Sequence, residues 1–128
     1  SIGSFTRNSG WINGKLERWL NTTGTDYDFP VGSASDYNPA TINFTALTSG
    51  SLEAEFISSN PGNGGLPLTE ATLDINNTFV DGYWAMTKAN SLESSDYDLA
   101  LTGNGLTSFT ITPETRLLTR ASGSSDWT

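Results

Sequence analysis

The stretch over residues 27–32, Tyr-Asp-Phe-Pro-Val-Gly, constrains the fold more than any other part of this chain. Pro30 has no N–H to donate to a sheet, and it favours an extended conformation at Phe29. Gly32 permits a positive φ angle, which lets the chain turn directly after Val31. The sequence therefore predicts an edge strand that ends at Pro30 and a tight corner beyond it, with Phe29 and Val31 anchored in the core.

A polar loop follows the corner and is closed by Asn38-Pro39. Apolar stretches over residues 11–20 and 42–47 lie on either side of the corner and the loop. We expect these two stretches to meet across the corner.

The composition favours strands over helices. At 128 residues the chain has the length of one typical domain, and we predict a single domain over residues 1–128. Only 16% of the residues are charged, and Ser, Thr and Asn fill the polar positions instead. These residues suit exposed strand faces and short turns, whereas the surfaces of long helices favour Glu, Lys, Gln and Ala.

The charge and the missing residue types narrow the function classes. A net charge of −8 argues against nucleic acid and against an anionic membrane surface as partner. The chain contains no cysteine, so no disulfide can form, and no apolar run approaches the ~20 residues of a membrane helix. Because an acidic, lysine-poor surface rich in Ser, Thr and Asn is typical of exported bacterial modules, we expect an extracellular or cell-surface location.

Short stretches in which apolar and polar residues alternate recur along the chain, separated by turn residues. They lie at residues 11–20, 42–47, 52–57, 73–79, 80–86, 97–101, 109–111 and 117–118. We predict that the second and third stretches form a hairpin around Ser49-Gly50, and that residues 60–67 form an exposed loop. About seven or eight short strands predict an all-β fold, a single antiparallel β-sandwich of immunoglobulin-like or jelly-roll-like type.

Both ends of the chain are polar. Residues 1–10 form a lead-in without periodicity, and residues 122–128 form a tail that is polar except for Trp127. We expect Trp127 to lie over a last strand bounded by Arg116 and Arg120, because a cation–π contact is available there.

An ordered series of motifs resembles a known kind of module. The series is Gly-Trp-Ile-Asn-Gly-Lys-Leu-Glu-Arg at residues 10–18, Tyr-Asp-Phe-Pro-Val-Gly at 27–32, Tyr-Asn-Pro at 37–39, Gly-Tyr-Trp at 82–84, and then residues 116–120 and Trp127. It is similar to the β-sandwich modules of large secreted and cell-surface proteins of Bacteroidota, often found near type IX secretion sorting domains. The resemblance covers nearly the whole chain and implies an architecture and a location rather than a reaction.

In one respect the sequence departs from these modules. They would continue with a further strand after the segment around Trp127, whereas this sequence ends at Thr128. The final strand is therefore expected to be missing or to come from a neighbour. A sandwich without that strand exposes an apolar groove between unpaired edges, and such edges invite strand addition from another chain. A homo-oligomer or a filament built by donated strands is one hypothesis.

The residue types leave little room for catalysis. Familiar nucleophilic catalysis and zinc sites use His or Cys, and the chain contains neither. Two carboxylates can hydrolyse a glycosidic bond, but Glu53 and Glu55 share one outward strand face, as in a solvated polar surface. We predict that the protein is not an enzyme and needs no cofactor apart from a structural calcium ion considered below.

Trp11, Trp19 and Tyr37 are the candidates for stacking on a sugar ring. Trp11 and Trp19 share the outward face of the predicted first strand. At ~3.3 Å per residue they lie about 27 Å apart, too far for one small site. The alternative is that each indole is covered by a loop or by the second sheet. The predicted structural anchors of the fold are Phe29, Pro30, Gly32 and Trp84.

Two Asp-x-Asp pairs, Asp26 with Asp28 and Asp96 with Asp98, are the candidates for metal binding. Such spacing places both carboxylates on one side of a strand end, and Ca²⁺ prefers oxygen ligands of this kind. The alternative is that these residues are turn aspartates or form ion pairs with Arg18 or Arg116.

Taken together, the sequence predicts a non-catalytic extracellular module of a bacterial surface protein or adhesin, which serves display, spacing or assembly. Its partner is then a glycan or a neighbouring protein subunit or domain. The alternative function is a carbohydrate-binding module that uses exposed Trp and Tyr side chains. An exposed aromatic platform flanked by Asn and Asp would favour carbohydrate binding, and an apolar groove beside an unpaired strand edge would favour assembly.

Overall fold

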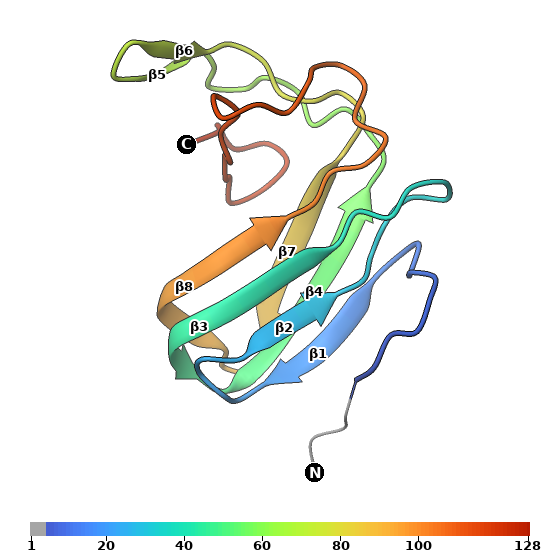
Figure 1. Ribbon diagram of the computed structural model, residues 1–128. Helices are drawn as coiled ribbons and strands as arrows, with labels where there is room; N and C mark the ends of the chain where they lie inside the picture. Colours follow the sequence, from blue (N-terminus) through green and yellow to red (C-terminus); the bar gives the residue numbers. More distant parts are fainter. Residues whose placement is uncertain (1–4) are drawn as a thin grey trace. The chain divides into compact units, whose positions relative to one another are not determined.

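A computed structural model describes residues 5–128 (Figure 1). This part of the chain contains eight strands and no helix, and the strands pair antiparallel. Their bounds are β1 Leu16–Leu20, β2 Asp26–Phe29, β3 Ala40–Thr48, β4 Gly50–Ile57, β5 Leu68–Glu70, β6 Leu73–Ile75, β7 Tyr83–Ala89 and β8 Glu93–Leu101. The predicted all-β class and strand number are confirmed. The first four residues of the predicted lead-in lie outside the described residues.

The chain divides into two compact units. The first runs to Ile57 and resumes over Trp84–Gly105, and the second comprises Ser58–Tyr83 and Leu106–Thr128. A single domain over residues 1–128 stays a prediction.

The first unit is built from two three-stranded sheets, with strand orders β1-β4-β7 and β2-β3-β8 (Figure 1). The inward side chains of both sheets and Leu92 in the turn between β7 and β8 form one core of buried residues: Leu20, Tyr27, Phe29, Ala40, Ile42, Phe44, Leu52, Ala54 and Leu92. Burial of such side chains from water is the main favourable term in folding. Two sheets packed over one core form the predicted antiparallel β-sandwich.

The corner after β2 has the predicted form. β2 is an edge strand that ends at Phe29, and both Phe29 and Val31 are completely buried. Gly32 packs so closely that a Cβ atom there would lie 2.2 Å from the carbonyl oxygen of Asp36. The glycine is therefore needed for close approach of two backbone segments, and its φ angle is not positive.

The predicted hairpin between residues 42–47 and 52–57 is wrong. β3 and β4 follow one another with only Ser49 between them, yet they belong to different sheets. Both sides of β3 are already taken by β2 and β8, so the chain crosses to the other sheet at Ser49. Gly50 makes this crossing possible because its Cα lies directly against the backbone of Leu92.

The first strand is shorter than the sequence predicts. β1 begins at Leu16, because Gly14 has a φ angle of +144° and interrupts the extended run. Upstream of it, Ile12 forms an isolated parallel bridge with Val31. The Ile12 N–H donates to the carbonyl of Pro30 at 2.8 Å, so the carbonyl at the corner still finds a partner.

The second unit contains one short hairpin, β5 with β6, and otherwise irregular chain. The predicted strands at Phe109–Ile111 and at Leu117–Leu118 are wrong, because residues 102–128 contain no strand. The strand that Trp127 was expected to cover is therefore absent, but the expected cation–π contact is confirmed: the indole is buried, and the Arg120 guanidinium carbon lies 4.3 Å from the ring centroid. Trp127 Nε1 also donates to the Gly62 carbonyl at 2.8 Å, which ties the tail to the loop over residues 60–67.

The close packing of Gly50 against Leu92, directly after the crossing at Ser49, yields a first prediction. In Gly50→Ala the new Cβ would lie 2.3 Å from the Leu92 backbone nitrogen, so the two segments must separate. We expect the free energy of unfolding, measured by urea denaturation, to fall by about 1–3 kcal/mol. Gly123→Ala, where a Cβ meets nothing within 4 Å, should leave it unchanged. Equal stability of the Gly50 variant and the wild type would contradict the close crossing.

Candidate functional site

A groove opens between the two sheets of the first unit, with a volume of about 230 Å³. Its lining comes from four strands and from the turn between β7 and β8: Ile42, Phe44, Leu52, Met86, Lys88, Leu92, Glu93, Ser94, Tyr97 and Leu99. Four of these residues, Ile42, Phe44, Leu52 and Leu92, also belong to the buried core. The floor of the groove is therefore the apolar core itself, reached from the side of β7 and β8.

The groove lies between two strand edges. β7 is the last strand of one sheet and β8 is the last strand of the other. They are seven and nine residues long, longer than the edge strands β1 and β2 at the opposite side of the sandwich. An edge strand presents backbone N–H and C=O groups that another strand can pair with.

The opposite side of the sandwich is closed by Arg18. Its Nη1 donates to the Asp28 backbone carbonyl at 2.5 Å, which joins β1 to β2 across the gap between the sheets. Its guanidinium carbon lies 4.5 Å from the ring centroid of Phe5 and 5.4 Å from that of Tyr27. Burial of the guanidinium lowers the pKa of Arg18 from its ordinary value, while the charge of Asp28 opposes the shift.

The mouth of the groove carries few polar groups. Tyr97 is 50% exposed there, and its ring lies 6.1 Å from that of Phe44 on the floor. Lys88 Nζ and Glu93 Oε1 form an ion pair at 2.5 Å between β7 and β8. Both side chains are largely exposed to water, so the pair contributes little to stability and is easily displaced.

Two of the predicted stacking residues lie together at another place in this unit. The rings of Trp11 and Tyr37 stack with centroids 5.8 Å apart and an angle of 27° between their planes. Trp11 Nε1 donates to the Ser33 carbonyl at 2.8 Å, and the indole stays 39% exposed. The Arg7 guanidinium lies 4.2 Å from the Tyr37 ring centroid. Sequence reasoning missed Arg7, because the lead-in has no pattern that would single it out.

Trp19 lies elsewhere, on β1 opposite Ser51, and is 47% exposed. Trp84 has the predicted core role: its ring packs edge-on against Phe56 with centroids 5.1 Å apart. Its Nε1 donates to the carbonyl of the buried Asn38 at 2.8 Å. Of the predicted aromatic candidates, the structure thus brings together Trp11 and Tyr37 alone.

The Asp-x-Asp pairs flank one sheet. Asp26 Oδ1 on β2 accepts from Asn43 Nδ2 at 2.7 Å, and Asp28 Oδ1 accepts from Thr41 Oγ1 at 2.8 Å. These partners are neutral side chains of β3 rather than the arginines considered above. Asp96 and Asp98 lie on β8 and are exposed.

The described residues contain no group of three or more acidic side chains arranged to hold a metal ion. Calcium binding by either Asp pair stays a prediction.

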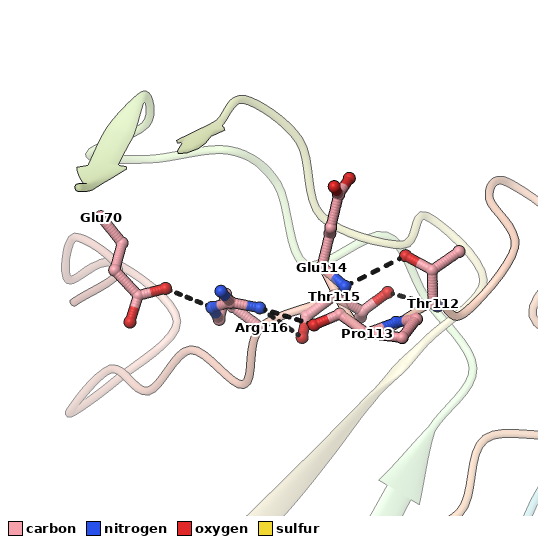
Figure 2. A network of polar contacts seen from close by, with 6 residues as sticks. All are labelled: Glu70, Thr112, Pro113, Glu114, Thr115 and Arg116. Carbon is pink, nitrogen blue, oxygen red and sulfur yellow. Dashed lines mark hydrogen bonds and ion pairs between the residues drawn. The ribbon is translucent and has the colours of Figure 1, made fainter. Parts of the chain in front are cut away.

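In the second unit a polar network surrounds Arg116 (Figure 2). Its guanidinium pairs with the Glu70 carboxylate of β5 and donates to the Pro113 carbonyl at 2.9 Å. Next to it, the Thr112 N–H donates to Thr115 Oγ1 at 2.9 Å, as in a turn that satisfies its own backbone. The network ties the irregular chain after residue 106 to the β5–β6 hairpin, so we assign it to the structure of this unit.

Asp81 holds the start of that irregular chain. Its carboxylate accepts from the N–H and hydroxyl groups of both Thr107 and Ser108, at 2.7 to 3.2 Å. Donors of this kind stabilise the charged form, and they lower the pKa of Asp81 from 3.8 to about 2.

Comparison of the chain with known protein families, with curated proteins and with solved structures finds no match. The similarity to cell-surface modules of Bacteroidota stays an expectation from the sequence. Within residues 5–128 no helix is long and apolar enough to cross a membrane.

The Asp81 contacts yield a pH prediction. Because its pKa is lower in the folded protein, this carboxylate stabilises the fold above its ordinary pKa of 3.8, and the effect disappears as pH falls toward about 2. Thermal melting should give a lower Tm for Asp81→Asn than for the wild type at pH 6, and the difference should shrink between pH 4 and pH 2. Glu114→Gln, also in the second unit, serves as the control. A Tm difference that stays constant down to pH 2 would contradict the assignment.

Proposed function

We propose that the protein is a non-catalytic extracellular module of a bacterial surface protein or adhesin, and that it assembles by accepting an extended segment of a neighbouring chain between β7 and β8. One observation carries this proposal: the groove of about 230 Å³ that reaches the core between two free strand edges. The extracellular location rests on the composition and on the resemblance described for the sequence.

Strand addition requires an apolar surface for the incoming side chains and a strand edge for the incoming backbone, and the groove offers both. Protein interiors are close-packed, and side chains that line a gap lose the contacts that would fill it. The side chains of an incoming strand restore these contacts over Phe44, Leu52 and Leu99. Its backbone N–H and C=O groups pair with the free edge of β7 or β8, as in other complexes formed by strand addition.

The energetic gain is sufficient for a stable contact. Burying one Ile or Leu side chain of a partner contributes about 1.5–3 kcal/mol, and two or three such side chains fit along an edge of seven to nine residues. Ordering of the partner offsets part of this gain, so we expect micromolar rather than nanomolar affinity for a short peptide.

A peptide-binding experiment tests the proposal. A nine-residue peptide in which Ile alternates with Gln should bind the full chain saturably, as measured by fluorescence polarisation of a labelled peptide. Tyr97→Ser, which removes the aromatic side chain from the mouth of the groove, should weaken binding about tenfold.

Trp19→Ser is the matched control, because Trp19 is as exposed as Tyr97 but lies away from the groove. Sedimentation over a concentration range reports whether the chain also assembles with itself. Absence of peptide binding up to millimolar concentration, together with a monomer at all concentrations, would overturn strand addition as the function.

A second candidate function is carbohydrate binding, which the stacked pair of Trp11 and Tyr37 favours. The apolar face of a sugar ring packs on an exposed indole, and two segments supply polar groups beside the pair: Asp36 in the loop before β3, and Asn104 after β8, whose amide donates to the Tyr37 carbonyl. This proposal needs no contribution from the groove.

Glycan-array binding of the wild type and of Trp11→Ala tests this second candidate. We expect the substitution to abolish glycan binding and Trp19→Ala to leave it unchanged, because Trp19 is not part of the stacked pair. Equal loss in both variants, or no glycan retained by the wild type, would remove carbohydrate binding as a candidate.

A further inference from the structure

We propose that the segment accepted by this module alternates apolar residues with lysine or arginine, and that Asp96 and Asp98 on β8 select it. This inference rests on the proposed strand addition and concerns the charge pattern of the partner. It assigns the partner to a basic extended segment of another protein rather than to β8 of a second copy of this chain.

From Asp96 to Leu99 the side chains of β8 alternate between the groove and the outer face of the sheet, whereas the pairing with β3 is irregular on both sides of the Ala46–Asp96 pair and Ser94 also lines the groove. Tyr97 and Leu99 line the groove, so Asp96 and Asp98 point to the opposite face. The register confirms this for Asp98, which pairs with Asn43 between the buried residues of β3. A strand added to the free edge of β8 therefore places its apolar side chains over the groove and its outward side chains beside these two carboxylates.

Asp96 and Asp98 are available for such a partner. Among residues 5–128 the ion pairs join Lys15 with Glu53, Lys88 with Glu93, and Arg116 with Glu70, so none of them involves Asp96 or Asp98. Asn43 lies between Asp26 and Asp98 in the sheet, and its amide donates to Asp26. The Asp26 and Asp28 carboxylates thus accept hydrogen bonds from neutral side chains of β3, whereas among residues 5–128 the Asp96 and Asp98 carboxylates have neither a hydrogen bond nor an ion pair.

Like charges oppose pairing of this edge with a second copy of itself. In an antiparallel pair of two β8 strands centred on Tyr97, Asp96 of each copy lies opposite Asp98 of the other copy. Like charges directly opposite one another destabilise a pair of strands. Charged side chains on an edge are a common means of preventing self-association, and the net charge of −8 adds repulsion at longer range.

Opposite charges across two strands have the reverse effect. Outward Lys or Arg side chains of the partner lie within contact range of Asp96 and Asp98, since directly opposite Cβ atoms are about 5 Å apart. At low salt the negative charge of the chain also speeds the encounter with a basic segment. The edge thus admits a basic strand and rejects an acidic one.

Three nine-residue peptides test the charge pattern. Each carries Ile at the positions facing the groove, and Lys, Gln or Glu at the outward positions. Fluorescence polarisation with the full chain at about 50 mM salt should give the order Lys, then Gln, then Glu, with about tenfold between Lys and Glu. The preference should decrease at 0.5 M salt, because these charges are exposed.

Two double variants separate the β8 edge from the overall charge. Asp96→Asn with Asp98→Asn should remove the preference for the Lys peptide over the Gln peptide. Asp26→Asn with Asp28→Asn makes the same change of charge at the opposite edge of the sheet, and it should keep the preference. Circular dichroism verifies that both variants are folded.

The outcomes distinguish the two levels of the proposal. If all three peptides bind equally, or if both double variants lose the preference to the same extent, the inference about Asp96 and Asp98 is overturned and strand addition stands. If none of the peptides binds and the chain is monomeric at all concentrations, strand addition itself is overturned, and the inference fails with it. Association of two copies through β8 edges would likewise overturn it, and disulfide formation by Tyr97→Cys detects such pairs, because residue 97 lies opposite itself in a pair centred there and the wild-type chain has no cysteine.

Discussion

The first unit depends on one completely buried polar residue, Asn38. Its backbone N–H donates to Val31 at the corner, and its carbonyl accepts from the Trp84 indole of β7. Its side chain accepts from the backbone N–H of Asn104 beyond β8 and donates to the Asp36 carbonyl. A buried amide is costly unless its groups are bonded, and here each bond ties down a different segment. The corner, the end of β8 and the start of β7 are thereby fixed relative to one another, and with them the two edges that border the groove.

Local chemistry explains which parts of this arrangement could be predicted. Pro30 ends β2 by its own backbone preference, so the prediction there is confirmed, whereas Gly32 is required by the close approach of the Asp36 carbonyl rather than by a positive φ angle. The partner of β4 depends instead on residues far away in the sequence, since β3 is occupied on both sides. Alternation indicates that a stretch is a strand but carries no information on which sheet it joins. The position of the groove follows from this sheet assignment. The sequence therefore predicts an apolar groove beside an unpaired edge but not that it lies between β7 and β8.

The aromatic candidates also divide into those whose role depends on local sequence and those whose role depends on contacts between distant residues. Trp84 could be assigned to the core from its neighbours, whereas the stacking of Trp11 on Tyr37 depends on the parallel bridge between Ile12 and Val31. At Phe109 and Ile111 the β-propensity is overridden, because Asp81 bonds the preceding backbone and Pro113 follows closely. A carboxylate that satisfies two successive N–H groups is a tertiary feature, and strand propensity within the segment does not reveal it.

The crossing at Ser49 has a mechanical consequence. Residues 21–25, Ser49 and residues 90–92 all carry the chain from one sheet to the other, and the register places the three links at one end of the sandwich. The backbone thus joins the two sheets covalently at that end only. At the far end the sheets are held by non-covalent contacts such as the hydrogen bond from Trp84 to Asn38. Under a pulling force the separation of the sheets must begin at the far end and proceed toward the covalently linked end. The part of the groove beside Leu92 is therefore the last to lose its shape under load.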